Sequence, residues 1–280
     1  MNKKIKMVLW IVIALAVLAL IGNFCYRMYL ANTEEIVHPQ VSFEIENYGI
    51  VKMELYPEYA PNTVANIIKL VEKGYYNNKV IYGKDEVCLY VGRNSAGEAE
   101  NPKASLLNEA IEADSDNDFE YTIKGEFLAN GYKDNTLNHQ KGVVSLMRSD
   151  YTQYFSELAE ESYNSGNAQI GILMEDTRAL NGMYTGFAKV IEGLDVLEKI
   201  YNEHQIKVDE EAEETHTHED GTDHTEEEGG IEEFEGYPVI KSATVDTFGV
   251  DYGMPQIDVA FDYDAYMNEI LSQYYSTTEE

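Results

Sequence analysis

Apolar and polar residues alternate in two neighbouring segments near the start of the main body of the chain. Residues 41–46 and 49–56 both repeat with period two, and Asn47 lies between them as a turn residue. Alternation places the apolar side chains on one face of an extended strand. Two such runs around a turn residue predict a β-hairpin.

The period changes to that of a helix in residues 60–74. Pro61 stands near the start of this segment and Gly74 just past its end, as expected at the two ends of a helix. Between them, four apolar residues are spaced i, i+3, i+4 and i+7: Val64, Ile67, Ile68 and Val71. The segment is therefore predicted to be an amphipathic helix that covers one open end of a β-structure.

Short strand-like runs recur through the rest of the body. They are residues 86–91, 121–125, 142–147, 169–174, 185–190 and 239–248. Residues 193–200 carry Leu194, Leu197 and Ile200 on one side and predict a second helix. The fold is thus predicted to be mainly β, a closed antiparallel β-barrel capped by the two helices.

The first 30 residues do not fit a globular fold. Three lysines precede an apolar segment, residues 7–24, which at about 18 residues is just long enough to cross a bilayer as a helix. We predict an uncleaved signal-anchor transmembrane helix within residues 1–30 and a linker over residues 31–40; a cleaved secretory signal is the alternative. The lysines before the span place residues 31–280 on the extracytoplasmic side of the cell membrane, in a single-pass protein.

The net charge of the chain limits the classes of partner that it can bind. A net charge of −31 excludes nucleic acid, because binding phosphates needs a basic surface. Residues 209–235 hold 14 acidic residues and no Lys or Arg. We predict that residues 209–236 are a disordered acidic insertion, since they cannot bury enough apolar surface to offset the ordering entropy. Its histidines are weak candidate metal ligands: His216, His218 and His224.

The sequence has two cysteines, one of which lies in the body. Cys25 stands at the edge of the apolar segment and Cys88 in the body, so the body has no internal disulfide framework. Cys88 is predicted to be a small buried apolar residue, with a reactive thiol as the alternative.

The C-terminal residues 253–280 are predicted to form an amphipathic helix with an acidic tail. Apolar and aromatic residues recur at helical spacing in this stretch: Tyr263, Tyr266, Met267, Ile270, Leu271 and Tyr274. We predict that this stripe packs on the body; recruitment of a partner protein is the alternative.

Several segments in sequence order resemble one known family. The segment 142–149 reads Gly-Val-Val-Ser-Leu-Met-Arg-Ser, 121–127 reads Tyr-Thr-Ile-Lys-Gly-Glu-Phe, and 245–249 reads Val-Asp-Thr-Phe-Gly. With the segment 180–200, they resemble the cyclophilin family of peptidyl-prolyl isomerases, in particular its bacterial members. The resemblance covers residues 41–252, with the acidic block as an insertion.

The resemblance implies a β-barrel that rotates X-Pro peptide bonds and needs no cofactor. In cyclophilins an apolar pocket holds the proline ring, and an arginine donates a hydrogen bond to the proline nitrogen. Such a donor stabilises the lone pair that appears when amide resonance is broken. The implied substrates are X-Pro segments of secreted or surface proteins.

The family's pocket is only partly kept when its positions are carried over to this chain. The residues that remain as implied substrate contacts are Leu89, Gln169, Leu180, Tyr184 and Phe187. Leu180 and Phe187 are also interpreted as core residues of any such barrel. The positions that depart from the family are Gly83, Cys88, Val91, Met147, Gly171 and Ala179.

The most consequential departure is at Gly83, which stands where the family has its catalytic arginine. No catalytic residue is therefore assigned with certainty. Lys84, Arg93 and Arg148 are the basic candidates for a substitute donor, and Arg148 is preferred because it flanks the groove in the alignment.

Three functions follow from these observations. The first is a peptidyl-prolyl isomerase with an altered, weakened site, and the second is an inactive module that binds proline-containing peptides. The third is a scaffold for the acidic, histidine-containing block as a metal-binding segment.

Overall fold

The computed structural model of the chain has two compact units, residues Met1–Val37 and His38–Glu280, and each is described here by itself. The described residues are 10, 12–13, 15–24, 36–153, 155–206 and 231–278. In the first unit, residues 15–24 are helical. Over these described ranges the structure contains no helix that combines the length and apolar character needed to span a membrane. The predicted span through residues 7–24 is therefore not confirmed.

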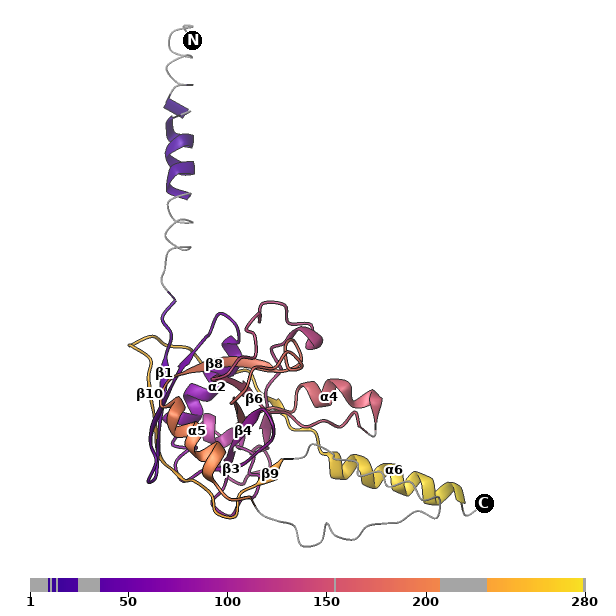
Figure 1. The fold of residues 1–280 in the computed structure, drawn as a ribbon. Coiled ribbons are helices and arrows are strands. Elements are labelled where there is room, and N and C mark those ends of the chain that lie inside the picture. The colour runs from indigo at the N-terminus through magenta and orange to yellow at the C-terminus, as the bar shows by residue number, and fades with distance from the viewer. Residues whose placement is uncertain are drawn as a thin grey trace. The chain divides into compact units, whose positions relative to one another are not determined.

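The second unit is built from short strands with helices between them (Figure 1). Its strands are β1 (Gln40–Ile45), β2 (Gly49–Leu55), β3 (Val80–Lys84), β4 (Cys88–Arg93), β5 (Tyr121–Thr122), β6 (Val143–Leu146), β7 (Ile170–Leu173), β8 (Thr185–Glu192), β9 (Glu232–Glu233), β10 (Ile240–Asp246) and β11 (Asp258–Val259). Its helices are α2 (Pro61–Glu72), α3 (Ala104–Leu107), α4 (Ala159–Tyr163), α5 (Leu194–Glu203) and α6 (Tyr263–Thr278), with 3-10 turns η1 (Leu128–Asn130) and η2 (Ser156–Leu158).

One curled antiparallel sheet forms the body. Its strand order in the described part of the chain is β10-β1-β2-β8-β6-β7-β4-β3-β9, and β5 pairs separately with β11. The two edges of the large sheet approach each other at an isolated bridge between Val80 and Val239. The predicted closed barrel is corrected to this curled sheet. A continuous ladder between β3 and β10 does not form because β9 takes the edge of β3, opposite Gly83 and Lys84.

Both helices that the periodicity predicted are present and bury their apolar faces. Helix α2 buries Val64, Ile67, Ile68 and Val71 in the main core, where they meet the inner face of the sheet. Helix α5 adds Leu197 and Ile200 to the same core. The sequence therefore located the two helices correctly, because in each the buried side chains follow the 3.6-residue period.

The start of α2 is capped by a residue that is distant in sequence. The Glu126 carboxylate accepts hydrogen bonds from the backbone N–H of Asn62 (2.9 Å) and from the N–H and hydroxyl of Thr63 (2.8 and 2.7 Å). The first N–H groups of a helix lack partners within the helix and carry partial positive charge, so a carboxylate stabilises them. This contact fixes the segment around Glu126 against α2.

The first turn of helix α6 packs on the body. The ring of Tyr263 stacks on Tyr151 with centroids 5.0 Å apart, and Tyr266 meets Phe155 edge-on at 5.5 Å. Farther along the helix, Leu271 is 45% exposed. The predicted packing of this stripe is therefore present at the start of the helix.

The buried residue His139 predicts a pH-dependent stability. Burial lowers the pKa of its imidazole, against the opposing effect of the Asn181 side chain 3.1 Å from Nδ1. Since the folded-state pKa lies below the unfolded value of about 6.5, the stability from neutral His139 is present above that value. It is lost as the pH falls through the folded-state pKa. We expect the midpoint of urea unfolding to fall more between pH 7 and pH 5 in the wild type than in His139→Gln. The same pH dependence in both proteins would contradict this.

Candidate functional site

A groove of about 200 Å³ opens on the outer side of the sheet, beside strands β3, β4 and β7. Its lining is polar apart from two side chains and contains two arginines. The lining residues are Tyr82, Arg93, Asn101, Met147, Arg148, Ser149, Ser165, Asn167, Gln169 and Ile231. Four residues singled out in the sequence therefore meet here: Arg93, Met147, Arg148 and Gln169.

Gln169 has a polar partner inside the groove. The Tyr82 hydroxyl donates to its Oε1 at 3.1 Å. Burial raises the pKa of Tyr82 to about 12, so this hydroxyl stays protonated and remains a donor at neutral pH. A glutamine on a mostly apolar strand needs such a partner, and the sequence did not indicate that Tyr82 supplies it.

Arg93 lies over the ring of Tyr82. Its guanidinium carbon is 4.0 Å from the centre of the Tyr82 ring, and its side chain is 24% exposed. Nη1 forms an ion pair with Glu233 (2.5 Å) and donates to the carbonyl oxygen of Gly97 (3.2 Å). Nε is buried without a partner among the described residues. Arg93 is thus held rigidly beside Gln169 and keeps donor capacity.

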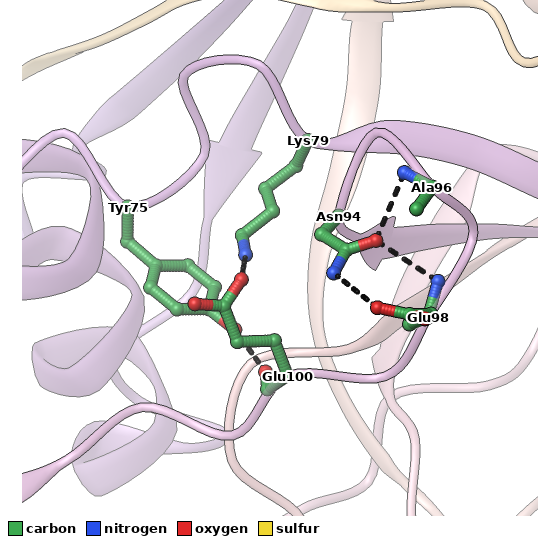
Figure 2. Close-up of polar contacts among 6 residues, drawn as sticks. All are labelled: Tyr75, Lys79, Asn94, Ala96, Glu98 and Glu100. Atoms are coloured by element: carbon green, nitrogen blue, oxygen red, sulfur yellow. Dashed lines mark hydrogen bonds and ion pairs between the residues drawn. The ribbon is translucent and has the colours of Figure 1, made fainter.

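The loop after β4 fixes the position of this side of the groove (Figure 2). Asn94 Oδ1 accepts hydrogen bonds from the N–H groups of Ala96 and Glu98, both at 3.0 Å. Farther along, the Glu100 carboxylate pairs with Lys79 and the Glu100 carbonyl accepts from the Tyr75 hydroxyl. These contacts hold the chain between Arg93 and Asn101, both of which line the groove.

A buried network holds the opposite side. Asn66 on α2 accepts from the Tyr121 hydroxyl (2.7 Å) and donates to the backbone carbonyl of Asn167 (2.5 Å). The Tyr76 hydroxyl donates to the next carbonyl, that of Ala168, at 2.7 Å. Hydrogen bonds from the core thus fix the backbone of Asn167 and Ala168, the two residues before Gln169.

Strand β9 covers Gly83, the position that the resemblance matches to the family's arginine. A Cβ atom at Gly83 would lie 2.5 Å from the carbonyl oxygen of Glu232 and 2.9 Å from a methyl carbon of Ile231. A side chain at this position cannot be accommodated unless the backbone of β9 moves. The close packing of β9 on β3 therefore requires a glycine at position 83.

Lys84, the basic candidate on β3, points away from the groove. The Lys84 ammonium donates to the backbone carbonyl of Tyr201 at 2.8 Å and lies 4.8 Å from the centre of that ring. Lys84 is therefore held at the end of α5, outside the groove lining.

Met147 fills the space next to Gly171, where the family has a phenylalanine. A Cβ atom at Gly171 would be 2.9 Å from the sulfur of Met147 and 3.8 Å from that of Cys88. Met147 packs against a small buried cluster on this outer face that includes Cys88 and Tyr90. The apolar volume that the family gives to an aromatic ring is here occupied by a methionine.

Cys88 is an apolar component of this cluster. It is 3% exposed, and burial raises the pKa of its thiol to about 12. We expect Cys88 in a Cys25→Ser chain to react with a disulfide reagent at least ~100-fold more slowly in the native protein than in guanidinium, because the thiolate is the reactive form. Stopped-flow absorbance at pH 8 measures both rates. Equal rates would show that Cys88 is a reactive thiol after all.

Arg148 lies at the other end of the groove among aromatic rings. Its guanidinium carbon is 4.6 Å from the centre of the Tyr184 ring, 5.1 Å from Tyr163 and 5.8 Å from Phe127. Its Nε and Nη1 are directed at the backbone carbonyls of Met183 and Ser149, at 3.4 and 3.3 Å. Tyr184 thus does not line the groove itself but contacts Arg148, which does.

The remaining sequence candidates lie elsewhere. Leu89, Val91 and Phe187 are buried in the main core, with at most 1% exposure, and do not line the groove. Leu180 packs against the outer cluster, and Ala179 is exposed. The candidate metal ligands His216, His218 and His224 lie outside the described residues.

Sequence reasoning missed Tyr82, Asn101 and Ile231 as groove residues. Tyr82 precedes Gly83 on a strand whose residues are nearly all buried, so no alternation marked its outward face. Ile231 lies inside residues 209–236, which were predicted to be disordered; that prediction is wrong for the described residues 231–236, which contain β9. Nothing in the local sequence of Ile231 indicates that it reaches β3.

The chain is similar to one family and to several of its members. The model of the family described as cyclophilin type peptidyl-prolyl cis-trans isomerase/CLD matches residues 40–221. Peptidyl-prolyl cis-trans isomerase B of Bacillus subtilis is 28% identical over 166 residues, which cover 57% of this chain and 89% of that protein. Peptidyl-prolyl cis-trans isomerase-like 2 of Rhizopus delemar is 25% identical over 166 residues, 59% of this chain but only 25% of that protein.

Two solved structures are similar to the chain over about three quarters of its length. A cyclophilin type peptidyl-prolyl cis-trans isomerase of Cryptosporidium parvum, determined in the presence of the dipeptide Ala-Pro, is 17% identical with a TM-score of 0.49. The match covers 74% of this chain and 98% of that one. A cyclophilin from Hirschia baltica is 22% identical with a TM-score of 0.42, over 73% of each chain.

Proposed function

This chain belongs to the cyclophilin type peptidyl-prolyl cis-trans isomerase family, and from that premise we propose that it isomerises X-Pro peptide bonds in the groove beside Gln169. The barrier to this rotation is about 18–20 kcal/mol, because resonance gives the C–N bond partial double-bond character. No covalent intermediate or cofactor is required. The protein has to hold the proline segment and favour the twisted amide.

Arg93 supplies the donor in this proposal, in place of a residue at position 83. The observation that carries the proposal is its position: the guanidinium is stacked on Tyr82, which is hydrogen-bonded to Gln169. A fixed cation that donates to the proline nitrogen stabilises the lone pair of the twisted amide. Its rigid hold by Glu233 and Gly97 means that little reorganisation is needed when a peptide binds.

A second candidate function is proline-peptide binding without catalysis. Met147 occupies the space beside Gly171, which reduces the room for a proline ring. Methionine is flexible, however, and can move aside for a ligand. The binding module and the weak isomerase therefore differ only in whether the donor acts on the bound amide.

Exchange NMR on a short peptide with one X-Pro bond separates the two functions. We expect the full chain in a non-ionic detergent to raise the cis–trans exchange rate in proportion to protein concentration. If the peptide binds but its exchange rate stays at the uncatalysed value, the inactive binding module is the correct function.

We propose in addition that residues 7–24 anchor the protein in the cell membrane, with the isomerase unit on the extracytoplasmic side. The support is the apolar sequence after three lysines, which favour the inner side. The chain should then stay in the membrane fraction at alkaline pH. A protease added to intact cells should degrade the unit after residue 37. Release of the chain by alkali, or protection from the protease, would argue against this location.

A further inference from the structure

The groove holds a second arginine that the proposed isomerisation does not use. Arg148 lines the groove together with Arg93, and none of the ten lining residues is Asp or Glu. The whole chain carries a net charge of −31, so a groove whose lining holds two arginines, one of them paired with Glu233, differs in charge from the rest of the protein. Local charge of this kind selects ligands by their complementary charge.

The two arginines differ in how their charges are balanced. Arg93 is paired with Glu233, whereas Arg148 takes part in none of the ion pairs within the described ranges. The nearby acidic residue Asp150 accepts hydrogen bonds from the backbone N–H and hydroxyl of Thr152, and these bonds, with a smaller effect of the Arg148 charge, lower the pKa of its carboxyl. Asp150 forms no ion pair with Arg148 within the described ranges, so the guanidinium can still bind the carboxylate of a ligand.

Arg148 is also held in place for that role. Tyr184, Tyr163 and Phe127 surround its guanidinium, and two backbone carbonyls orient Nε and Nη1. A guanidinium has five N–H donors in a fixed plane, and two parallel N–H groups match the two oxygens of a carboxylate. Holding the side chain rigid in advance lowers the entropy lost when a ligand binds.

We propose that the groove selects X-Pro peptides that carry a glutamate or aspartate close to the proline, with Arg148 as the residue that binds the carboxylate. This specificity rests on the proposed function, because the groove must first accept a proline-containing peptide. Met147 borders both the Arg148 end of the groove and the space beside Gly171, so one short peptide can reach both.

The test compares matched peptides on the full chain in a non-ionic detergent. Capped alanine-based hexapeptides contain one proline and one glutamate at successive positions, and each has a partner with glutamine instead. Fluorescence anisotropy measures binding, and exchange NMR measures isomerisation. At the best position we expect the glutamate peptide to bind about five- to tenfold more tightly than its glutamine partner.

Variants assign the preference to one residue. Arg148→Gln should abolish it, and Arg148→Lys should keep part of it, since a lysine retains the charge without the planar fork. Lys189→Gln removes the same charge from an exposed position on β8 outside the groove, and should leave the preference unchanged.

Each outcome bears on one claim. Equal binding of glutamate and glutamine peptides at every position, or a preference that persists in Arg148→Gln, overturns the inference while leaving isomerisation intact. A glutamate preference that depends on Arg148 without any isomerisation supports the inference and rejects the isomerase. If no peptide binds at millimolar concentration, both are overturned.

Discussion

Replacing Arg93 by glutamine is expected to lower the isomerisation rate of the chain by about 10²–10³-fold, the usual loss when one positioned transition-state donor is removed. The glutamine leaves Tyr82 and Gln169 in place but removes the cation that lies over the Tyr82 ring. Exchange NMR on a proline peptide gives the rate. Peptide binding, measured in parallel, should change much less, because the donor acts mainly on the twisted amide.

Two further variants separate chemistry from structure at this position. Arg93→Lys keeps the charge but not the planar fork, so we expect a rate between those of the wild type and Arg93→Gln. Glu233→Gln removes the ionic partner of Arg93 while keeping Arg93 itself. It should lose less rate than Arg93→Gln, because the guanidinium and its hydrogen bond to the Gly97 carbonyl remain. An unchanged rate in Arg93→Gln would show that Arg93 is not the donor.

Restoring the family's arginine with Gly83→Arg is expected to destabilise the protein without creating a faster isomerase. Any side chain at position 83 meets the backbone of β9, since its Cβ would lie 2.5 Å from the Glu232 carbonyl oxygen. Gly83→Ala alone should therefore cost about 1–3 kcal/mol of unfolding free energy, as expected when atoms are added at a filled site. Urea unfolding followed by circular dichroism measures this cost.

Gly236→Ala is the matched control for this prediction. It lies three residues after β9, and a Cβ there has no neighbour within 4 Å. Its unfolding free energy should stay within about 0.5 kcal/mol of the wild type, as for most surface changes. Unchanged stability in Gly83→Ala, or a rate increase in Gly83→Arg, would show that β9 yields easily and that the missing arginine alone limits catalysis.

The loss of the arginine at position 83 is thereby connected to the insertion before β10. Strand β9 lies within the acidic block and pairs with β3 opposite Gly83 and Lys84. Its Glu233 forms an ion pair with Arg93. Strand β9 therefore fills the space beside Gly83 and supplies the glutamate that pairs with Arg93.

Much of the fold could be predicted from local pattern. The first hairpin, α2 and α5 were located from apolar spacing alone, because each buries one face against a common core. Strand β3 was missed, since nearly all its residues are buried and it shows no alternation. The closed barrel was predicted from the number of strands. Closure would need β10 to pair along β3, but β9 pairs there instead.

The candidate site could be predicted only in part. Gln169, Met147 and Arg148 were found from the family resemblance and do meet in one groove. Leu89 and Val91 were placed at the site by alignment but lie in the core. On β4 the outward residues are Cys88 and Tyr90, so a position carried over by sequence alone can fall on the wrong face of a strand.

By itself the sequence determined the family and the helices, because these depend on short segments whose residue types and spacing are preserved. The tertiary structure decided which residues form the candidate site. Gly83 meets β9 about 150 residues later in the chain, and Arg93 meets Glu233 about 140 residues later. Such pairings depend on long-range strand contacts, and neither partner's local sequence carries information about the other.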